Sequence, residues 1–201
     1  MGGMLSRSQS QRDELPEFTF DVRESWLAWL EANHAASAGL WLRIAKRGAA
    51  ELSVSYDDAL TVALCFGWID GQKRKLDETA WLQKFTPRGP RSRWSRRNRE
   101  KAEELVRGGA MRPAGLREVQ RAKADGRWEA AYDSPSTATV PGDLQAALDD
   151  HPSAKAFFET LDAANRYAIL YRLQTAAKPE TREKRLRKFL EMLERQEKLH
   201  P

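Results

Sequence analysis

The densest group of residues able to do chemistry is a basic segment, TPRGPRSRWSRRNREK, at residues 86–101. It holds seven cations and a single acid, Glu100, with Trp94 near its centre. Guanidinium groups bind carboxylates and phosphates through paired hydrogen bonds, and an indole offers a flat surface to an aromatic ring or a base. The segment therefore predicts one of three things: a pocket for a small anionic or aromatic ligand, a nucleic-acid surface, or a solvated helix face.

Within the basic segment, four positions are the best candidates for a ligand site. Arg88 follows a Thr-Pro pair, so we expect an extended, rigid backbone at the end of a strand. Ser92, Trp94 and Asn98 lie where a helix is expected to begin, and the free backbone N–H groups of a helix start favour an anion. The competing interpretation is a solvated face formed by the arginines at positions 93, 96, 97 and 99.

A second candidate is the stretch GWIDGQK at residues 67–73. Trp68 and Asp70 lie where a helix is expected to give way to a strand, a place that can aim a carboxylate into a cleft, and Lys73 follows. If the site is catalytic, Asp70 acts as general acid or base while Arg88 stabilises developing negative charge. The alternative is that Asp70 caps the turn with Gly71 or pairs with a neighbouring lysine or arginine.

Other kinds of chemistry have no motif in this sequence. The three histidines, His34, His151 and His200, are far apart and have no ligand partner three or four residues away, so we expect no metal and no cofactor. Neither a Walker-type nor a GxGxxG pattern is present. The single cysteine, Cys65, lies in an apolar run and is expected to be a small buried hydrophobic residue, with no intramolecular disulfide.

Charge and hydropathy bound the class of protein. The net charge is +5, and residues 86–101 contribute 7 − 1 = +6, so the remainder sums to −1 and the basic character is local. No run of about 18 apolar residues exists, which predicts no membrane span. The first residues lack the apolar stretch of a signal peptide, and we therefore expect a cytoplasmic protein.

The elements that must position these residues begin with an α+β pattern. Residues 21–34 have helical periodicity with Asp21 as the expected N-cap, and residues 39–47 alternate as a strand. Ser55 is expected to cap a helix that stops at Gly67. Two short strands joined by a turn near Asp77 follow. This order predicts a small antiparallel sheet packed with helices.

The rest of the chain is expected to be helical. One helix is capped by Ser92 or Ser95, and another begins at Pro113. Helical patterns then cover residues 142–151, 152–176 and 179–199. Taken together, we predict a disordered tail at 1–16, an α+β domain at 17–131, a linker at 132–141 and an all-α C-terminal region at 142–201.

Several blocks resemble the bacterial YdeI/OmpD-associated family, also called OmdA-like or bacteriocin-protection proteins. The blocks are ALCFGWIDGQKRKLD, FTPRGPRSRWSRRN, AKADGRW, VPGDLQAALDDHPSAKAFF and AAKPETREKRL, and they span about residues 18–198. The resemblance implies a role in tolerating antimicrobial peptides or envelope stress, and no particular reaction. Its C-terminal block includes Arg182 and Arg185, which are expected to close over the cleft of the first domain or to pair with acids.

The function expected from the sequence is that of a bacterial resistance- or stress-associated protein that binds a small anionic or aromatic ligand. The predicted ligand-binding residues are Trp68, Asp70, Lys73, Arg88, Ser92, Trp94, Asn98 and Arg182. One alternative is an enzyme that uses Asp70 and Arg88, although the lack of a histidine or metal partner argues against it. Another is a nucleic-acid or protein adaptor acting through a basic helix at 95–107, and the oligomeric state stays open. The ligand-binding and enzyme hypotheses both predict that Arg88 and Trp94 point inward, into a pocket.

Overall fold

The computed structural model describes residues 15–201, so most of the tail predicted at 1–16 lies outside the described residues. The described chain divides into two compact units. The N-terminal unit comprises residues up to Ser92 together with Glu100–Asp125. The C-terminal unit comprises Arg93–Arg99 together with Gly126–Pro201.

The N-terminal unit is built on a four-stranded sheet with the strand order β1-β2-β4-β3. Its elements are β1 (Glu17–Phe18), α1 (Arg23–Asn33), β2 (Leu40–Ala45), α2 (Tyr56–Cys65), β3 (Trp68–Lys75), β4 (Ala80–Pro87) and α4 (Pro113–Ala124), joined by most of α3 (Arg96–Arg107). β4 pairs antiparallel with both β2 and β3, which confirms the predicted small antiparallel sheet. The two-residue strand β1, which pairs parallel to β2, was not predicted, because two residues carry no periodicity.

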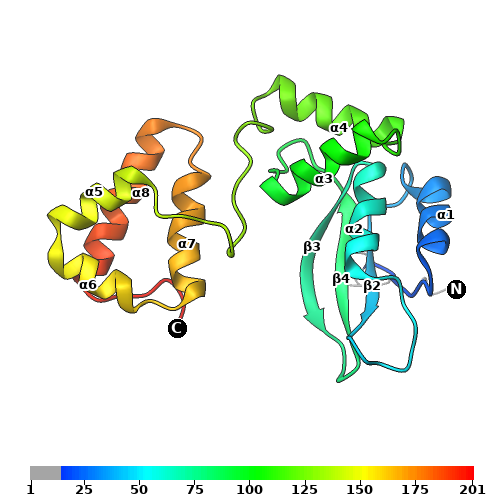
Figure 1. Cartoon of the computed structure of the whole chain (residues 1–201), viewed down its shortest axis with the longest axis horizontal. Coiled ribbons are helices and arrows are strands. Elements are labelled where there is room, and N and C mark those ends of the chain that lie inside the picture. Colours follow the sequence, from blue (N-terminus) through cyan, green and yellow to red (C-terminus); the bar gives the residue numbers. More distant parts are fainter. Residues whose placement is uncertain (1–14) are drawn as a thin grey trace, which may run out of the picture. The chain divides into compact units, whose positions relative to one another are not determined.

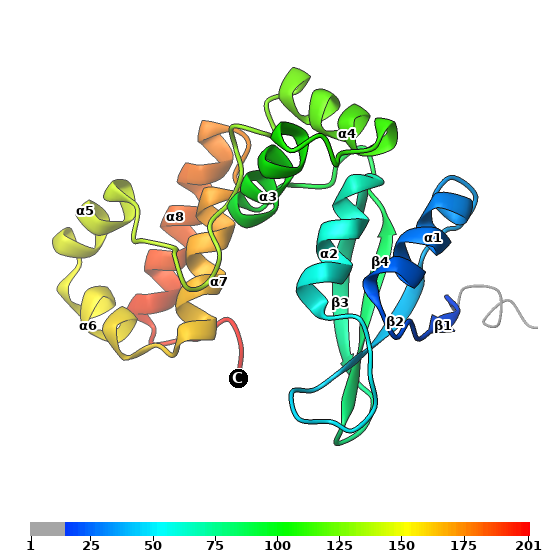
Figure 2. The same ribbon diagram turned by 45° about the vertical axis from the view of Figure 1, so that its right-hand side comes forward.

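Helices α1 and α2 cover one face of this sheet (Figures 1 and 2). Leu40, Leu42 and Ile44 of β2 are buried on that face, as their alternation predicts. Trp26 of α1 is fully buried, and its indole N–H donates to the carbonyl of Ala59 at 3.0 Å. Trp26 therefore places a large aromatic side chain in the core with its polar atom hydrogen-bonded, the arrangement that a buried indole favours.

The ends of the first two helices test the predicted caps. Ser55 caps α2, and its hydroxyl accepts a hydrogen bond from the Asp58 N–H at 3.1 Å. The prediction for Asp21 is wrong: α1 begins at Arg23, so Val22 takes the N-cap position without a side-chain bond. Asp21 lies one residue too early for its carboxylate to serve as the cap.

The end of α2 brings another helix close to the sheet. Gly67 has φ +72°, as expected for a glycine that ends a helix, and a Cβ there would lie 2.9 Å from Cγ of Glu118. The missing side chain therefore lets α4 approach the start of β3. Where β3 pairs with β4, the register shifts between Asp70 and Lys73.

The C-terminal unit is helical around one apolar core, as predicted. Its helices are α5 (Gly142–Asp150), α6 (Pro152–Thr160), α7 (Ala163–Gln174) and α8 (Pro179–Glu194). In the last helix Phe189 and Leu193 are buried, while Leu186 and Leu190 pack partly buried against the same core. Before α5, an isolated bridge joins Ser95 to Tyr132.

Candidate functional site: an arginine-lined cavity in the N-terminal unit

Two predicted ligand-binding residues, Trp68 and Arg88, line one cavity of about 160 Å³ in the N-terminal unit. Four elements form its walls: the end of α1 at His34, the turn between α2 and β3, the end of β4, and the first turns of α4 with Arg117 and Glu118. These segments are distant in sequence. The cavity therefore exists only because α4 packs against the start of β3 and the end of β4.

Trp68 forms a rigid wall of this cavity. Its side chain is 1% exposed, and its indole N–H donates to the His34 carbonyl at 3.1 Å. The His34 ring in turn lies 5.1 Å from the ring of Phe66, centroid to centroid. The hydrogen bond and the ring contact tie the end of α1 to the start of β3, so the wall is held from two sides.

Arg88 is held at the end of β4 and is only 5% exposed. Its backbone N–H donates to the carbonyl of Gly67 at 2.9 Å. The next residue is also tied down: the Gly89 carbonyl accepts from Arg121 at 3.2 Å, and the Gly89 N–H donates to the Ser92 hydroxyl at 3.0 Å. Burying a cation is costly unless anionic or hydrogen-bonding groups compensate it, so the position of Arg88 points to specific interactions.

The charges around the cavity favour an anion. Arg88, Arg117 and Glu118 give the lining a formal charge of 2 − 1 = +1. The carboxylate of Glu118 is already ion-paired with Arg121. Arg117 is exposed and makes no ion pair within residues 15–201. Arg117 therefore offers an entering anion a guanidinium outside the ion pairs of the described residues, a group that carboxylates and phosphates prefer.

The other predicted residues of the N-terminal unit do not line this cavity. Asp70 is half-buried, and its carboxylate accepts a hydrogen bond from the Tyr56 hydroxyl at 2.8 Å. Lys73 is exposed, with its ammonium 4.4 Å from the centre of the Trp81 ring. Ser92 braces the loop after β4. Asp70 therefore does not line the cavity that Arg88 lines.

The remaining predicted residues belong to the C-terminal unit. Trp94 is 2% exposed and meets Trp128 edge to face, with ring centroids 4.8 Å apart. Asn98 is buried, and its backbone N–H donates to the hydroxyl of Ser95, which confirms Ser95 as the cap of α3. Arg88 and Trp94 are therefore both buried, but they belong to different units, and Trp94 does not line the cavity that Arg88 lines.

Arg182 pairs with an acid, one of its two predicted arrangements. Its guanidinium donates two hydrogen bonds to the Asp143 carboxylate, at 2.6 and 2.7 Å, and one to the Leu173 carbonyl at 2.8 Å. Hydrogen bonding from Arg182 holds the pKa of Asp143 below its usual value. These bonds join α8 to the start of α5 and the end of α7, which is a structural role.

The basic helix α3 presents fewer available cations than its sequence indicates. Arg96 forms an ion pair with Asp133 at 3.0 Å, and Lys101 pairs with Asp57 at 2.9 Å. Nucleic-acid binding depends on several cations that are available to phosphates. The pairing of these two side chains weakens the adaptor hypothesis, although Arg97 is exposed.

Arg117 and Glu118 were missed at the sequence level because they lie on α4 without any motif. The sequence did indicate where Arg117 lies on its helix, because Pro113 predicts the helix start and Arg117 is one turn further along. Only packing shows that this turn faces Arg88. Residues 15–201 contain no group of three or more histidine, cysteine, aspartate or glutamate side chains that could hold a metal ion, and no helix long and apolar enough to cross a membrane.

The fold is thus an α+β unit with a cavity lined by Arg88 and Arg117, followed by an all-α unit. Residues 18–118, half of the chain, match the model of the family described as Domain of unknown function (DUF8412), and the chain belongs to this family. Residues 137–196 match the family described as Bacteriocin-protection, YdeI or OmpD-Associated (OmdA). The resemblance to OmdA is therefore confirmed over these 60 residues, a smaller part of the chain than the 18–198 predicted. No curated protein and no solved structure matches significantly.

Proposed function

We propose that this protein acts in bacteriocin protection or a related bacterial stress response by binding a small anionic or aromatic ligand. The match of residues 137–196 to a family described as bacteriocin-protection supports the role. The cavity of the N-terminal unit supports the binding of an anion. The ligand class we propose is an antimicrobial compound or metabolite that carries a carboxylate or phosphate.

The observation that carries this proposal is the cavity itself, lined by the exposed Arg117 and by the buried residue Arg88. A volume of about 160 Å³ is below the roughly 300–1,000 Å³ of sites that enclose a drug-sized ligand. The cavity therefore suits a small anion, or the anionic group of a larger molecule whose remainder stays outside. Trp68 offers an apolar wall beside that group.

The test is a calorimetric titration of the full chain with phosphate, benzoate and a short single-stranded oligonucleotide. We expect phosphate or benzoate to bind, and Arg117→Gln to weaken binding about tenfold, because an exposed charged partner is removed without disturbing the core. Arg88→Gln should weaken it further. Arg91→Gln is the matched control, since Arg91 is exposed in the same segment and does not line the cavity.

Two results would reject this proposal: no binding of either small anion, or binding that survives unchanged in both cavity variants. Binding of the oligonucleotide alone, with a steep loss on adding salt, would instead favour the adaptor hypothesis. An enzyme remains the weaker alternative, since Asp70 bonds to Tyr56 and lies outside the lining of the Arg88 cavity.

A further inference from the structure

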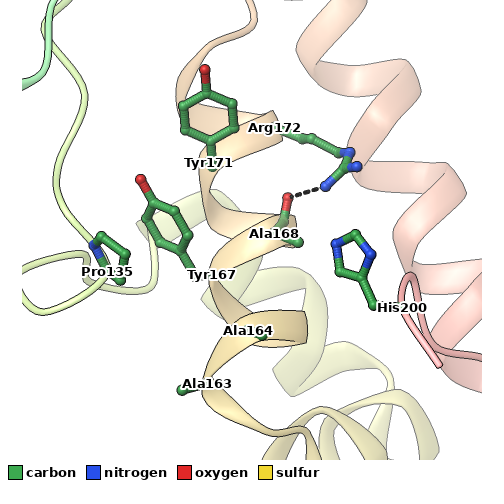
Figure 3. A pocket seen from close by; sticks show the side chains of 8 residues that line it. All are labelled: Pro135, Ala163, Ala164, Tyr167, Ala168, Tyr171, Arg172 and His200. Atoms are coloured by element: carbon green, nitrogen blue, oxygen red, sulfur yellow. Dashed lines mark hydrogen bonds between the residues drawn. The ribbon is translucent and has the colours of Figure 1, made fainter. Parts of the chain in front are cut away.

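The C-terminal unit contains a larger groove along α7, with a volume of about 640 Å³ (Figure 3). Ala164 and Ala168 lie at its centre, with Tyr167 and Tyr171 on one side and Arg172 and His200 on the other. The volume lies within the roughly 300–1,000 Å³ of small-molecule sites. The groove thus combines an apolar floor, an aromatic wall and a cationic wall.

The aromatic wall is held in place by its neighbours. The Tyr167 hydroxyl donates to the Asp133 carbonyl at 2.9 Å, and burial raises the pKa of Tyr167 to about 12, so this phenol stays neutral. The ring of Tyr171 lies 5.9 Å from that of Tyr167 and meets Tyr132 edge to face at 4.9 Å. Two fixed rings, one turn apart on a helix, offer a stacking surface at little entropic cost.

The cationic wall has a charge without an acidic partner. One guanidinium nitrogen of Arg172 donates to the Ala168 carbonyl at 3.0 Å, which holds the side chain beside the groove (Figure 3). Among residues 15–201, no carboxylate lies within ion-pair distance of Arg172. A ligand anion there would meet a guanidinium whose charge no protein carboxylate already neutralises.

His200 is brought to the groove by a buried amide. Asn165 of α7 is 1% exposed, and its side-chain oxygen accepts from the backbone N–H of His200 at 2.9 Å. Its side-chain nitrogen donates to the His200 carbonyl at 3.2 Å. Asn165 therefore fixes the backbone of His200, which places an imidazole next to Arg172 as a second hydrogen-bonding group.

We propose that the α7 groove is a second ligand site, and that it takes a planar aromatic anion such as an aryl carboxylate. The ring would lie over Ala164 and Ala168 against Tyr167, with its carboxylate toward Arg172 and His200. A single unpaired cation suits one carboxylate better than a nucleic acid, which needs several phosphate contacts. This site shares no residue with the Arg88 cavity, so either proposal can fail without the other.

The test is a fluorescence titration of the full chain with 2-naphthoate and its neutral analogue 2-naphthamide. We expect 2-naphthoate to bind, and the amide to bind about tenfold more weakly because it cannot pair with Arg172. Ala164→Leu should abolish binding by filling the floor of the groove. Ala164 is exposed on a helix and leucine is a good helix former, so the fold should be retained.

Matched control variants show whether a loss of binding is specific to the α7 groove or is caused by any substitution of the same kind. Ala156→Leu, at an exposed helical position on α6 outside the groove, is the control for Ala164→Leu and should leave binding of 2-naphthoate unchanged. Arg172→Gln should weaken binding about tenfold, whereas its control Arg187→Gln should not. Absence of 2-naphthoate binding, equal affinity for the amide, or binding that survives Ala164→Leu would each overturn the proposal.

Discussion

Replacing Arg182 by methionine tests whether three long helices of the C-terminal unit are joined through one guanidinium. Arg182 of α8 donates two hydrogen bonds to Asp143 of α5 and one to the carbonyl of Leu173 of α7. Methionine keeps the unbranched apolar stem and the helix propensity of this position. The substitution therefore removes the polar contacts with little change in packing.

The expected loss of unfolding free energy follows from the solvent exposure of the Arg182–Asp143 ion pair. The side chains of Arg182 and Asp143 are 30% and 39% exposed, so solvent screening limits the ion pair to about 0.5–1 kcal/mol. Loss of the bond to the Leu173 carbonyl adds about 1 kcal/mol. We expect Arg182→Met to lower the free energy of unfolding by about 1.5–2 kcal/mol.

The assay is urea denaturation of the full chain followed by far-UV circular dichroism. A double-mutant cycle with Asp143→Asn should give a coupling free energy of about 0.5–1 kcal/mol. The more exposed pair of Lys155 and Asp149, whose side chains are 42% and 51% exposed, is the control, and its cycle should give a smaller coupling. A coupling between Arg182 and Asp143 below about 0.3 kcal/mol would show that the contact does not stabilise the unit.

Further predictions concern pH, a helix cap and the two cores. The pKa of Asp143 is lower in the folded protein than in the unfolded chain. The Asp143 carboxylate therefore stabilises the fold fully above its unfolded-state pKa of about 4, and this stabilisation is lost as the pH falls through its folded-state pKa. Between about pH 5 and 3, the free energy of unfolding should fall more for the wild-type protein than for Asp143→Asn. Ser55→Ala should cost about 1 kcal/mol, measured by urea unfolding, because the cap to Asp58 is lost. Phe189→Ala should cost about 3–5 kcal/mol and identify the transition of the C-terminal unit, and unchanged stability would contradict its place in the core. Trp26→Phe should cost about 2–3 kcal/mol in the same assay, since it leaves a void and removes the indole hydrogen bond to the Ala59 carbonyl.

Much of the fold was predictable because it depends on local patterns. The alternation of Leu40, Leu42 and Ile44 marks β2, and the serine three residues before Asp58 marks the start of α2. The one wrong cap, Asp21, shows the limit of such patterns. A shift of one residue in the helix start changes which side chain can reach the free N–H groups, and periodicity does not resolve helix ends to one residue.

The candidate site was predictable only in part. Arg88 and Trp68 were identified from their residue types and from their places at strand ends, and the structure puts both at one cavity. Asp70 lies two residues from Trp68, yet it bonds to Tyr56 and does not line that cavity. Proximity in sequence therefore did not decide which carboxylate or cation accompanies Arg88.

The sequence by itself determined the classes of element, the local basic charge and the all-α character of the C-terminal region, because each depends on residues within a few turns of one another. Only the tertiary structure decided which side chains share a cavity. Arg117 and Arg88 are 29 positions apart, and His200 and Arg172 are 28 apart. Such pairs meet because helices pack against sheets and other helices, and that packing is set by the whole core.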